Sequence, residues 1–171
     1  MIVRENEDYN SRLAYQLKIT PEIFYLDVQS GVKLVRYIEG AETLNNATIQ
    51  YMNHIEKVIM VLRTLHTSGV RFNNDFNVFK EIEIYEELLG RVKGWMYEGY
   101  SELRPSIFAL ADRLNQLGVT LTPCHNDLVA ENFVKGLDGK IHLIDWEYSG
   151  MNDPLWDLAA LFIESSFSEE N

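Results

Sequence analysis

Two aspartates and an asparagine form the part of the sequence best suited to chemistry. Asp127 stands five positions before Asn132, and Asp145 ends a short apolar run at residues 141–144. The apolar run predicts a strand, so we expect the three side chains to converge at a strand-turn-strand. In phosphoryl transfer one Asp orients the attacking hydroxyl, while an Asn and a second Asp hold magnesium on the phosphates. Oxygen ligands without Cys or paired His favour magnesium or manganese over zinc, and we expect magnesium.

Ordinary turn structure is the alternative explanation, because Asp and Asn are common turn residues. An isolated Asp followed five positions later by Asn carries little weight. Here His125 stands two positions before Asp127, and Glu147 follows Asp145 in an Asp-Trp-Glu sequence. Carboxylates gathered in this way repel one another unless a cation or a positively charged substrate lies between them. The combination favours a functional site over a plain hairpin.

Two segments resemble those of a known family. Residues 125–133, HNDLVAENF, and residues 142–159, HLIDWEYSGMNDPLWDLA, are similar to the catalytic and metal-binding loops of choline/ethanolamine kinases, bacterial choline kinases in particular. That family lies within the aminoglycoside-phosphotransferase-like kinases. The resemblance implies transfer of the ATP γ-phosphate to the hydroxyl of choline, with ethanolamine or an aminoglycoside as alternative substrates.

The resemblance also implies roles for single residues. Asp127 matches the catalytic base, and Asn132 and Asp145 match the Mg²⁺ ligands. Glu147 and Tyr148 match positions that help form the pocket for a cationic head group in choline kinases.

Nucleotide-binding and supporting residues follow from the same resemblance. Those implied for the nucleotide are Glu7, Arg36, Tyr37 and Ile38. Glu7 is the candidate for the helix glutamate that pairs with an ATP-contacting lysine, although a solvated surface glutamate is the alternative. The other three lie beside a hinge at residues 39–41, where adenine docks on backbone groups. His125 and Asp157 are implied as structural supports, with Asp157 tying the magnesium loop to the start of a helix.

The implied fold is α+β and protein-kinase-like. Residues 1–39 would form a partial small lobe with a helix and a β-hairpin, and residues 40–171 a mostly helical large lobe with the catalytic-loop hairpin. Such kinases carry a Gly-rich loop and a strand lysine before the first helix. Only residues 1–3 precede that helix here, and neither Lys18 nor Lys33 is expected on a strand leading into a helix. We therefore expect a chain truncated at both ends, with little activity. A non-catalytic remnant that binds a cation or a partner chain is the alternative of another class.

Apolar periodicity predicts the elements that position these residues. A helix is expected at residues 4–17, with an apolar face of Tyr9, Leu13, Ala14 and Leu17. Segments rich in β-branched and aromatic residues at 22–28 and 32–38 predict a hairpin. Without partner strands the second segment presents an open apolar edge, through which we expect self-association.

Four more helices are predicted, at residues 48–67, 78–89, 102–117 and 154–163, followed by a polar tail at residues 165–171. The leucine-rich stripe of the third is expected in the core; it comprises Leu103, Ile107, Leu110, Leu114 and Leu117. His66 is interpreted as a core or interface histidine rather than a ligand, and Cys124 as a buried spacer rather than a nucleophile.

Composition limits the remaining function classes. The 171 residues, 46% of them hydrophobic, suit one domain with a core. A net charge of −11 argues against nucleic acid. One cysteine excludes an internal disulfide and fits a reducing cytosol. The sequence has no apolar run of membrane-spanning length, and its first ten residues are too polar for a signal peptide, so we expect a cytoplasmic protein without a membrane partner.

Overall fold

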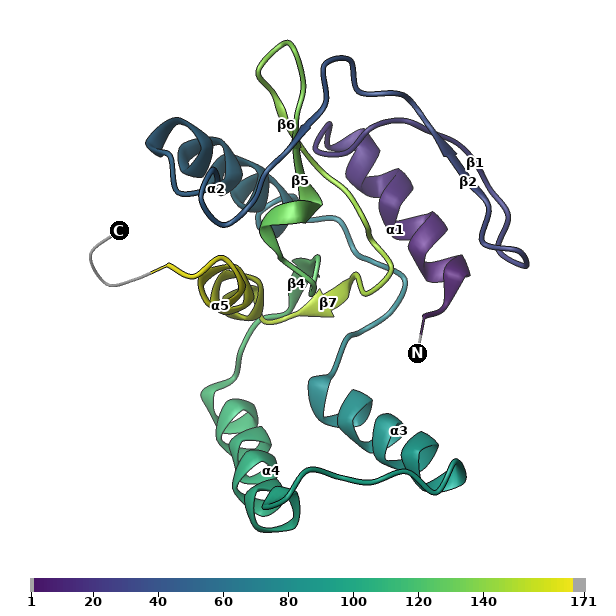
Figure 1. The fold of residues 1–171 in the computed structure, drawn as a ribbon, viewed down its shortest axis with the longest axis vertical. Coiled ribbons are helices and arrows are strands. Elements are labelled where there is room, and N and C mark those ends of the chain that lie inside the picture. The colour runs from purple at the N-terminus through teal and green to yellow at the C-terminus, as the bar shows by residue number, and fades with distance from the viewer. Residues whose placement is uncertain (1, 168–171) are drawn as a thin grey trace. The chain divides into compact units, whose positions relative to one another are not determined.

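A computed structural model describes residues 2–167 of the chain, and helices and short strands both contribute to it (Figure 1). In chain order the elements are α1 (Arg4–Gln16), β1 (Ile23–Leu26), β2 (Lys33–Val35), β3 (Glu42–Thr43), α2 (Met52–His66), α3 (Val78–Arg91), α4 (Tyr100–Leu117), β4 (Thr122–Cys124), β5 (Phe133–Lys135), β6 (Ile141–Leu143), β7 (Gly150–Asn152) and α5 (Pro154–Glu164). The described residues form two compact units, residues 77–120 and residues 2–76 with 121–167. The mixture of elements confirms the α+β class.

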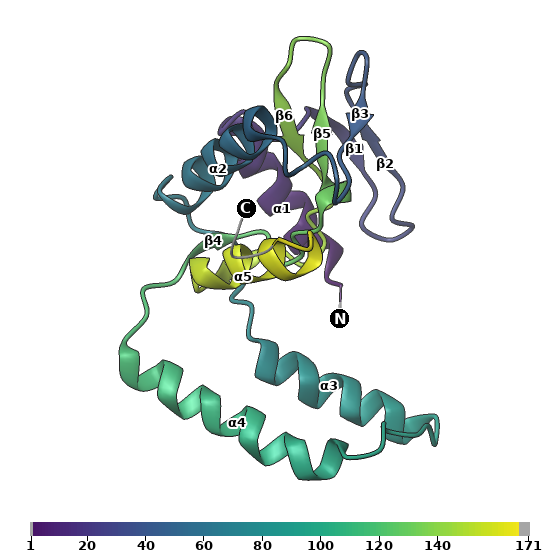
Figure 2. The same ribbon diagram turned by 60° about the vertical axis from the view of Figure 1, so that its left-hand side comes forward.

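The larger unit is organised around α2 and the antiparallel β5–β6 hairpin. Strand β5 also pairs with β3, which gives a sheet of order β3-β5-β6 (Figure 2). Its core includes Leu128, Phe133, Leu143 and Trp146, each at most 1% exposed. Burying one such side chain contributes about 1.5–3 kcal/mol. Because these residues are sequence neighbours of Asp127, Asn132 and Asp145, the core fixes the backbone on which the candidate site is built.

The N-terminal helix α1 lies beside the β1–β2 hairpin (Figures 1 and 2). The strands pair antiparallel, with Leu26 opposite Lys33, and Gly31 takes a φ of 78° in the turn. That left-handed conformation is one glycine adopts without strain. The predicted hairpin is confirmed, although both strands are shorter than predicted.

The buried face of α1 is more polar than predicted. Asn10, Ser11 and Ala14 are fully buried, whereas Tyr9 is 49% exposed. The prediction of Tyr9 as an apolar-face residue is therefore wrong. Tyr9 matches the helical spacing of the apolar residues. The neighbouring Asn10 lies in the interior instead, because its side-chain amide has hydrogen-bond partners there.

Helix α2 begins at Met52 rather than at residue 48. The preceding residues form a turn, in which the Asn45 side chain accepts hydrogen bonds from the backbone N–H groups of Ala47 and Thr48, both at 3.0 Å. The helix buries Val58, Val61, Leu62 and Leu65, while Met52 and Ile59 are exposed.

The smaller unit is a pair of helices, α3 and α4. The Asn77 side chain caps α3 by accepting from the Phe79 N–H at 3.0 Å. Glu86 of α3 accepts from Arg104 at 2.8 Å and from Tyr100 at 2.7 Å, both on α4. These hydrogen bonds lower the pKa of Glu86 to about 2, with the Arg104 bond as the largest cause.

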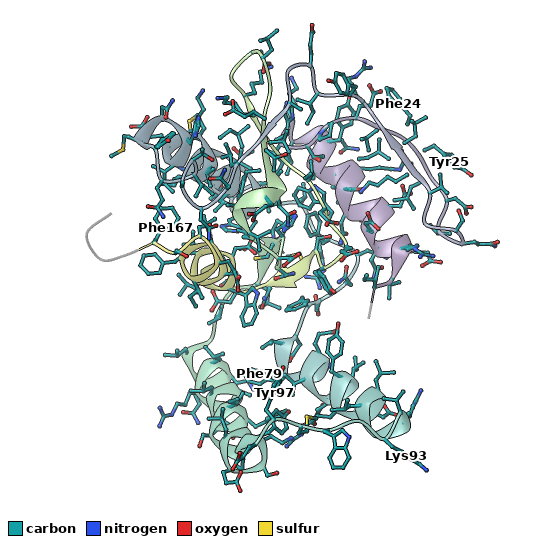
Figure 3. The ribbon with its side chains drawn as sticks, viewed as in Figure 1. Phe24, Tyr25, Phe79, Lys93, Tyr97 and Phe167 are labelled. Atoms are coloured by element: carbon teal, nitrogen blue, oxygen red, sulfur yellow. The ribbon has the colours of Figure 1, made fainter. Side chains whose placement is uncertain are left out.

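The leucine-rich stripe of α4 is not a core in this unit. Leu103, Leu110, Leu114 and Leu117 are 42–75% exposed, and no residue of either helix is buried. Figure 3 shows Phe79 and Tyr97 in this unit, and Tyr97 is 93% exposed. The core prediction is wrong because two helices have too little surface to enclose side chains between them.

No helix in residues 2–167 combines the length and apolar character required to cross a membrane.

Phe167, labelled in Figure 3, stacks on Phe162 with ring centroids 6.0 Å apart. Residues 168–171 of the polar tail lie outside the described residues.

Candidate active site

A bent loop between β4 and β5 carries Asp127 and Asn132. Asn126 has a φ of 70°, a left-handed conformation that Asn tolerates better than most residues. Both neighbours of Asp127 are buried, whereas Asp127 itself is partly exposed. The loop therefore presents this carboxylate toward solvent from an otherwise buried backbone.

The side chain of Asn132 is fixed within the same loop. Its Nδ2 donates to the Asp127 backbone oxygen at 2.8 Å. Asn132 is buried, and it ends the short 3-10 turn Ala130–Asn132 that leads into β5. Because the amide nitrogen is used for this bond, the amide oxygen is available for a metal ion.

Asp157, in the first turn of α5, holds the Asp127 loop in place through hydrogen bonds. Its fully buried carboxylate accepts from the backbone N–H of His125 at 2.9 Å and of Asn126 at 2.7 Å, and from His66 Nε2 at 2.8 Å. Asp157 therefore holds the loop that carries Asp127 and Asn132 against the start of α5.

His125 links this loop to the strand that ends at Asp145. Its Nε2–H donates to the Ile144 carbonyl at 2.9 Å, and its ring packs edge-on against Trp146 with centroids 5.0 Å apart. Burial lowers the pKa of His125, outweighing the opposite effect of the Asp157 charge. A neutral imidazole that donates through Nε2 fits this position.

Asn126 joins the two candidate loops through its side chain. Its Nδ2 donates to the Tyr148 carbonyl at 3.0 Å, and its Oδ1 accepts from Asn152 Nδ2 at 2.9 Å. Strand β4 also pairs with β7 directly, with Cys124 opposite Gly150. The Asp127 loop and the segment after Asp145 therefore form one hydrogen-bonded structure.

Asp145 follows β6 at a second bend. Its φ is 66° and its side chain is exposed. The next residue, Trp146, is buried and donates from Nε1 to the Leu143 carbonyl at 3.1 Å and to Thr20 Oγ1 at 3.2 Å. Anchoring by Trp146 holds the strained backbone that turns Asp145 outward.

The acids of the site share one electrostatic environment. The pKa of Glu147 is raised, first by partial burial and then by the charges of Asp145, Glu7 and Asp127, while Lys33 opposes the shift. Glu7 and Glu147 also line a cleft of about 620 Å³ between α1 and the hairpin turn. The structure thus brings Glu7 together with the acids of the central loops.

The residues proposed for adenine lie farther along the hairpin. Arg36 donates from Nε to Glu22 at 3.0 Å and lies over the Phe24 ring at 5.1 Å, so its side chain is already engaged. Tyr37 is 80% exposed and Ile38 is partly buried. The hinge meets the β5–β6 turn where Glu39 O accepts from Leu137 N at 2.8 Å.

His66, Cys124 and Asp157 bring their polar atoms within 4.8 Å of one another, which raises the question of a metal centre. Burial raises the pKa of the Cys124 thiol to about 12, and that thiol donates to the Asn152 carbonyl at 3.5 Å. A protonated thiol is a poor ligand and a poor nucleophile. The geometry supports the interpretation of Cys124 as a buried spacer and of His66 as a satisfied interior histidine.

Several supporting residues were missed by sequence reasoning. Asn10 of α1 donates to Asn74 Oδ1 at 3.0 Å and to Ser149 O at 3.1 Å, and accepts from Asn73 N at 3.0 Å. Asn126 could have been suspected from its place next to Asp127. Asn10 had no such signal, because a polar residue on a helix is ordinarily solvated.

Known proteins match nearly the whole chain. The sequence profile of the choline/ethanolamine kinase family matches residues 1–171. Protein LicA of Haemophilus influenzae is 39% identical over 172 residues, which cover 99% of this chain and 63% of LicA. The crystal structure of choline kinase LicA from Streptococcus pneumoniae superposes with a TM-score of 0.90 at 41% identity, covering 99% of this chain and 59% of that one.

A more distant structure extends the likeness in fold alone. The aminoglycoside phosphotransferase APH(2'')-Ib matches with a TM-score of 0.62 at 16% identity. The expected aminoglycoside-phosphotransferase-like, protein-kinase-like fold is confirmed. The chain spans about three-fifths of the length of the two LicA proteins, at 63% and 59%.

Proposed function

We propose, from the premise that this chain belongs to the choline/ethanolamine kinase family, that it carries the catalytic and metal-binding loops of an ATP-dependent phosphotransferase. Its acceptor is the hydroxyl of choline or a similar amino alcohol. Asp127 is the base that accepts the proton of this hydroxyl. Asn132 and Asp145 are the Mg²⁺ ligands, and Glu147 with Tyr148 attracts the cationic head group.

One observation supports the proposal above the others. The Asp127 loop and the segment after Asp145 are joined through Asn126, and both rest on buried anchors, Asp157 and Trp146. Phosphoryl transfer depends almost entirely on positioning and on electrostatic stabilisation. A base and two metal ligands fixed on one hydrogen-bonded scaffold meet that requirement.

The donor set fits magnesium. It consists of one carboxylate and one amide oxygen, both hard ligands. The hydrogen bond from Asn132 Nδ2 to Asp127 O leaves the Asn132 oxygen for the ion, and the exposed Asp145 carboxylate makes no hydrogen bond or ion pair within residues 2–167. Bound magnesium would neutralise charge on the transferring phosphate.

The charge of the site supports a cationic acceptor. Glu147 carries a raised pKa beside Asp145, Glu7 and Asp127, so a positive head group placed there would relieve repulsion. This argument fits choline, ethanolamine and an aminoglycoside alike. The substrate preference for choline rests on the family and on its similarity to a protein called choline kinase LicA.

For the nucleotide, we propose that Glu7 supports the phosphates and that adenine docks beside Arg36, Tyr37 and Ile38. A structure of LicA in complex with AMP, 41% identical to this chain, supports nucleotide use. Since the guanidinium of Arg36 is engaged with Glu22, the contribution of this segment is through backbone groups. The division into lobes at residues 39 and 40 and the cytoplasmic location stay proposals.

The test is phosphocholine formation by the chain with Mg²⁺, ATP and choline. Weak turnover is expected, and Asp127→Asn should abolish it. Asp75→Asn is the control, because Asp75 is exposed and its side chain, among residues 2–167, pairs only with Arg71, at 3.2 Å. Turnover that survives Asp127→Asn would refute the assignment of the base.

The alternative of another class is a non-catalytic domain that binds a cation or a partner chain. It predicts that choline raises the melting temperature while no phosphate is transferred, with or without ATP. A competition panel of choline, ethanolamine and an aminoglycoside then ranks the acceptors.

A further inference from the structure

Asn126, the residue before Asp127, has its backbone held by α5. Its N–H donates to Asp157 Oδ1 at 2.7 Å, and its carbonyl accepts from Trp156 Nε1 at 3.3 Å. The residue is 7% exposed and takes a φ of 70°. The bonds to α5 therefore fix the backbone that leads into Asp127, and the Asn126 side chain is not needed for that purpose.

The side chain of Asn126 reaches the segment that follows β6. Its Nδ2 donates to the Tyr148 carbonyl at 3.0 Å, and its Oδ1 accepts from Asn152 Nδ2 at 2.9 Å. A primary amide supplies a donor and an acceptor at fixed positions, whereas a carboxylate would lack the donor. The bond from Asn152 orients the amide, and the bond to Tyr148 sets the separation between the two segments.

This hydrogen bond lies between the residues proposed for the two ends of the acceptor. Asp127, which receives the hydroxyl, follows Asn126 directly. Glu147 and Tyr148, which attract the ammonium group, lie at the other end of the bond. Partial burial and then the charges of nearby acids, Asp127 among them, raise the pKa of Glu147, so both ends of the acceptor lie in one electrostatic field.

We propose that Asn126 is a positioning residue that selects the acceptor by the distance between its hydroxyl and its ammonium nitrogen. The inference rests on the proposed function and deepens it. A site that contacts both ends of a small molecule discriminates by length when the two contacts cannot move apart. The favoured length is that of choline and ethanolamine, in which two carbons separate oxygen from nitrogen.

The rest of the structure allows this role to be tested without unfolding the site. Cys124 of β4 pairs with Gly150 of β7 through the main chain, and this pairing does not involve the Asn126 side chain. Glycine adopts a left-handed backbone without strain. Asn126→Gly should therefore keep the bend and loosen the spacing without separating the two segments.

The experiment compares the affinities of two acceptors by calorimetry in the presence of Mg²⁺. They are choline and its homologue with one additional methylene between nitrogen and oxygen. The unchanged chain should bind choline about 10-fold or more tightly than the homologue, and Asn126→Gly should reduce this ratio to about 3-fold or less. A general weakening of the site would affect both acceptors alike, so the ratio reports spacing rather than stability.

Asn77→Gly is the matched control. The Asn77 side chain also makes two hydrogen bonds, accepting from Phe79 N at 3.0 Å and from Lys80 N at 3.2 Å. The same substitution thus removes the same number of side-chain bonds outside both candidate loops. Its ratio of affinities should equal that of the unchanged chain.

Asn152→Ala is a second variant that acts on the same bond indirectly. It removes the donor that orients the Asn126 amide and leaves the bond to Tyr148 available. The ratio should shift in the same direction as in Asn126→Gly, by a smaller amount. Thermal unfolding shows whether each variant is folded, and Asn152→Ala decides the question if Asn126→Gly is not.

Four results would overturn the proposal: an unchanged ratio in the folded variants, an equal shift in Asn77→Gly, no preference for choline in the unchanged chain, or no saturable binding by it. Failure of the proposed function looks different. A ratio that depends on Asn126 while no phosphocholine forms would sink the reaction and keep the role of Asn126. Turnover that Asp127→Asn abolishes, with equal ratios in the unchanged chain and Asn126→Gly, would do the reverse.

Discussion

Replacing Asp157 by Asn tests how the loop that carries Asp127 is held. The carboxylate is fully buried and accepts from His125 N, Asn126 N and His66 Nε2, at 2.7–2.9 Å. Asparagine has nearly the same shape, but one of its two terminal atoms is a donor. At least one N–H group of the loop must then face an N–H group, and the charge that strengthens the other bonds is lost.

The size of the effect follows from these bonds. A buried donor left unpaired costs about 1–3 kcal/mol. Loss of charge assistance at the remaining bonds adds about 1 kcal/mol, since hydrogen bonds to charged groups contribute more than neutral ones. We expect Asp157→Asn to lower the free energy of unfolding by about 2–4 kcal/mol.

Urea unfolding monitored by tryptophan fluorescence measures this difference, because Trp146 and Trp156 lie in the same unit. Asp75→Asn is the matched control, with an expected change within about 0.5 kcal/mol, as for an exposed site. Similar small losses in both variants would refute the reasoning, since they would mean that the Asp157 hydrogen bonds do not hold the loop.

Three further predictions use other parts of the molecule. Cys124 should resist iodoacetamide at pH 8 in the folded chain and react in urea, because its thiol is buried and its pKa is raised to about 12; rapid native labelling would contradict this. His125 has a lowered pKa, so its contribution to stability should be complete above about pH 6.5 and lost as the pH falls below that value, where the unfolded chain takes up the proton. Urea unfolding at pH 8 and pH 5.5 measures the loss, and His125→Gln should flatten it. The chain should also self-associate through the β1–β2 hairpin, where Tyr25 and Leu34 are 54% and 58% exposed; a monomer by light scattering at high concentration would count against it.

The central loops were predictable because their pattern is local. A short apolar strand before Asp145 and the turn residues around Asp127 specify β6 and the bend with little help from the rest of the chain. Pro154 at the first position of α5, capped by Asp153 accepting from Leu155 N at 2.9 Å, is equally local.

Contacts between distant segments were not predictable. Helical periodicity identifies an apolar face but not what covers it, so the Leu110 face of α4 was assigned to a core that its own unit does not provide. The partnership of Lys33 with Glu7 joins residues 26 positions apart and depends on how the hairpin folds back on α1. Asn10 is a similar case, since its partners come from two remote segments.

The hydrogen bonds of Asn10 have a consequence for regulation. Protein kinases are switched by moving the helix that carries the lysine's glutamate partner. Here α1 is tied to Asn74 and to Ser149, four residues after Asp145. An outward swing would break these buried bonds, each contributing about 0.5–1.5 kcal/mol. Displacing α1 and displacing the segment after Asp145 are thus energetically coupled, so that a ligand that orders one also favours the ordered position of the other.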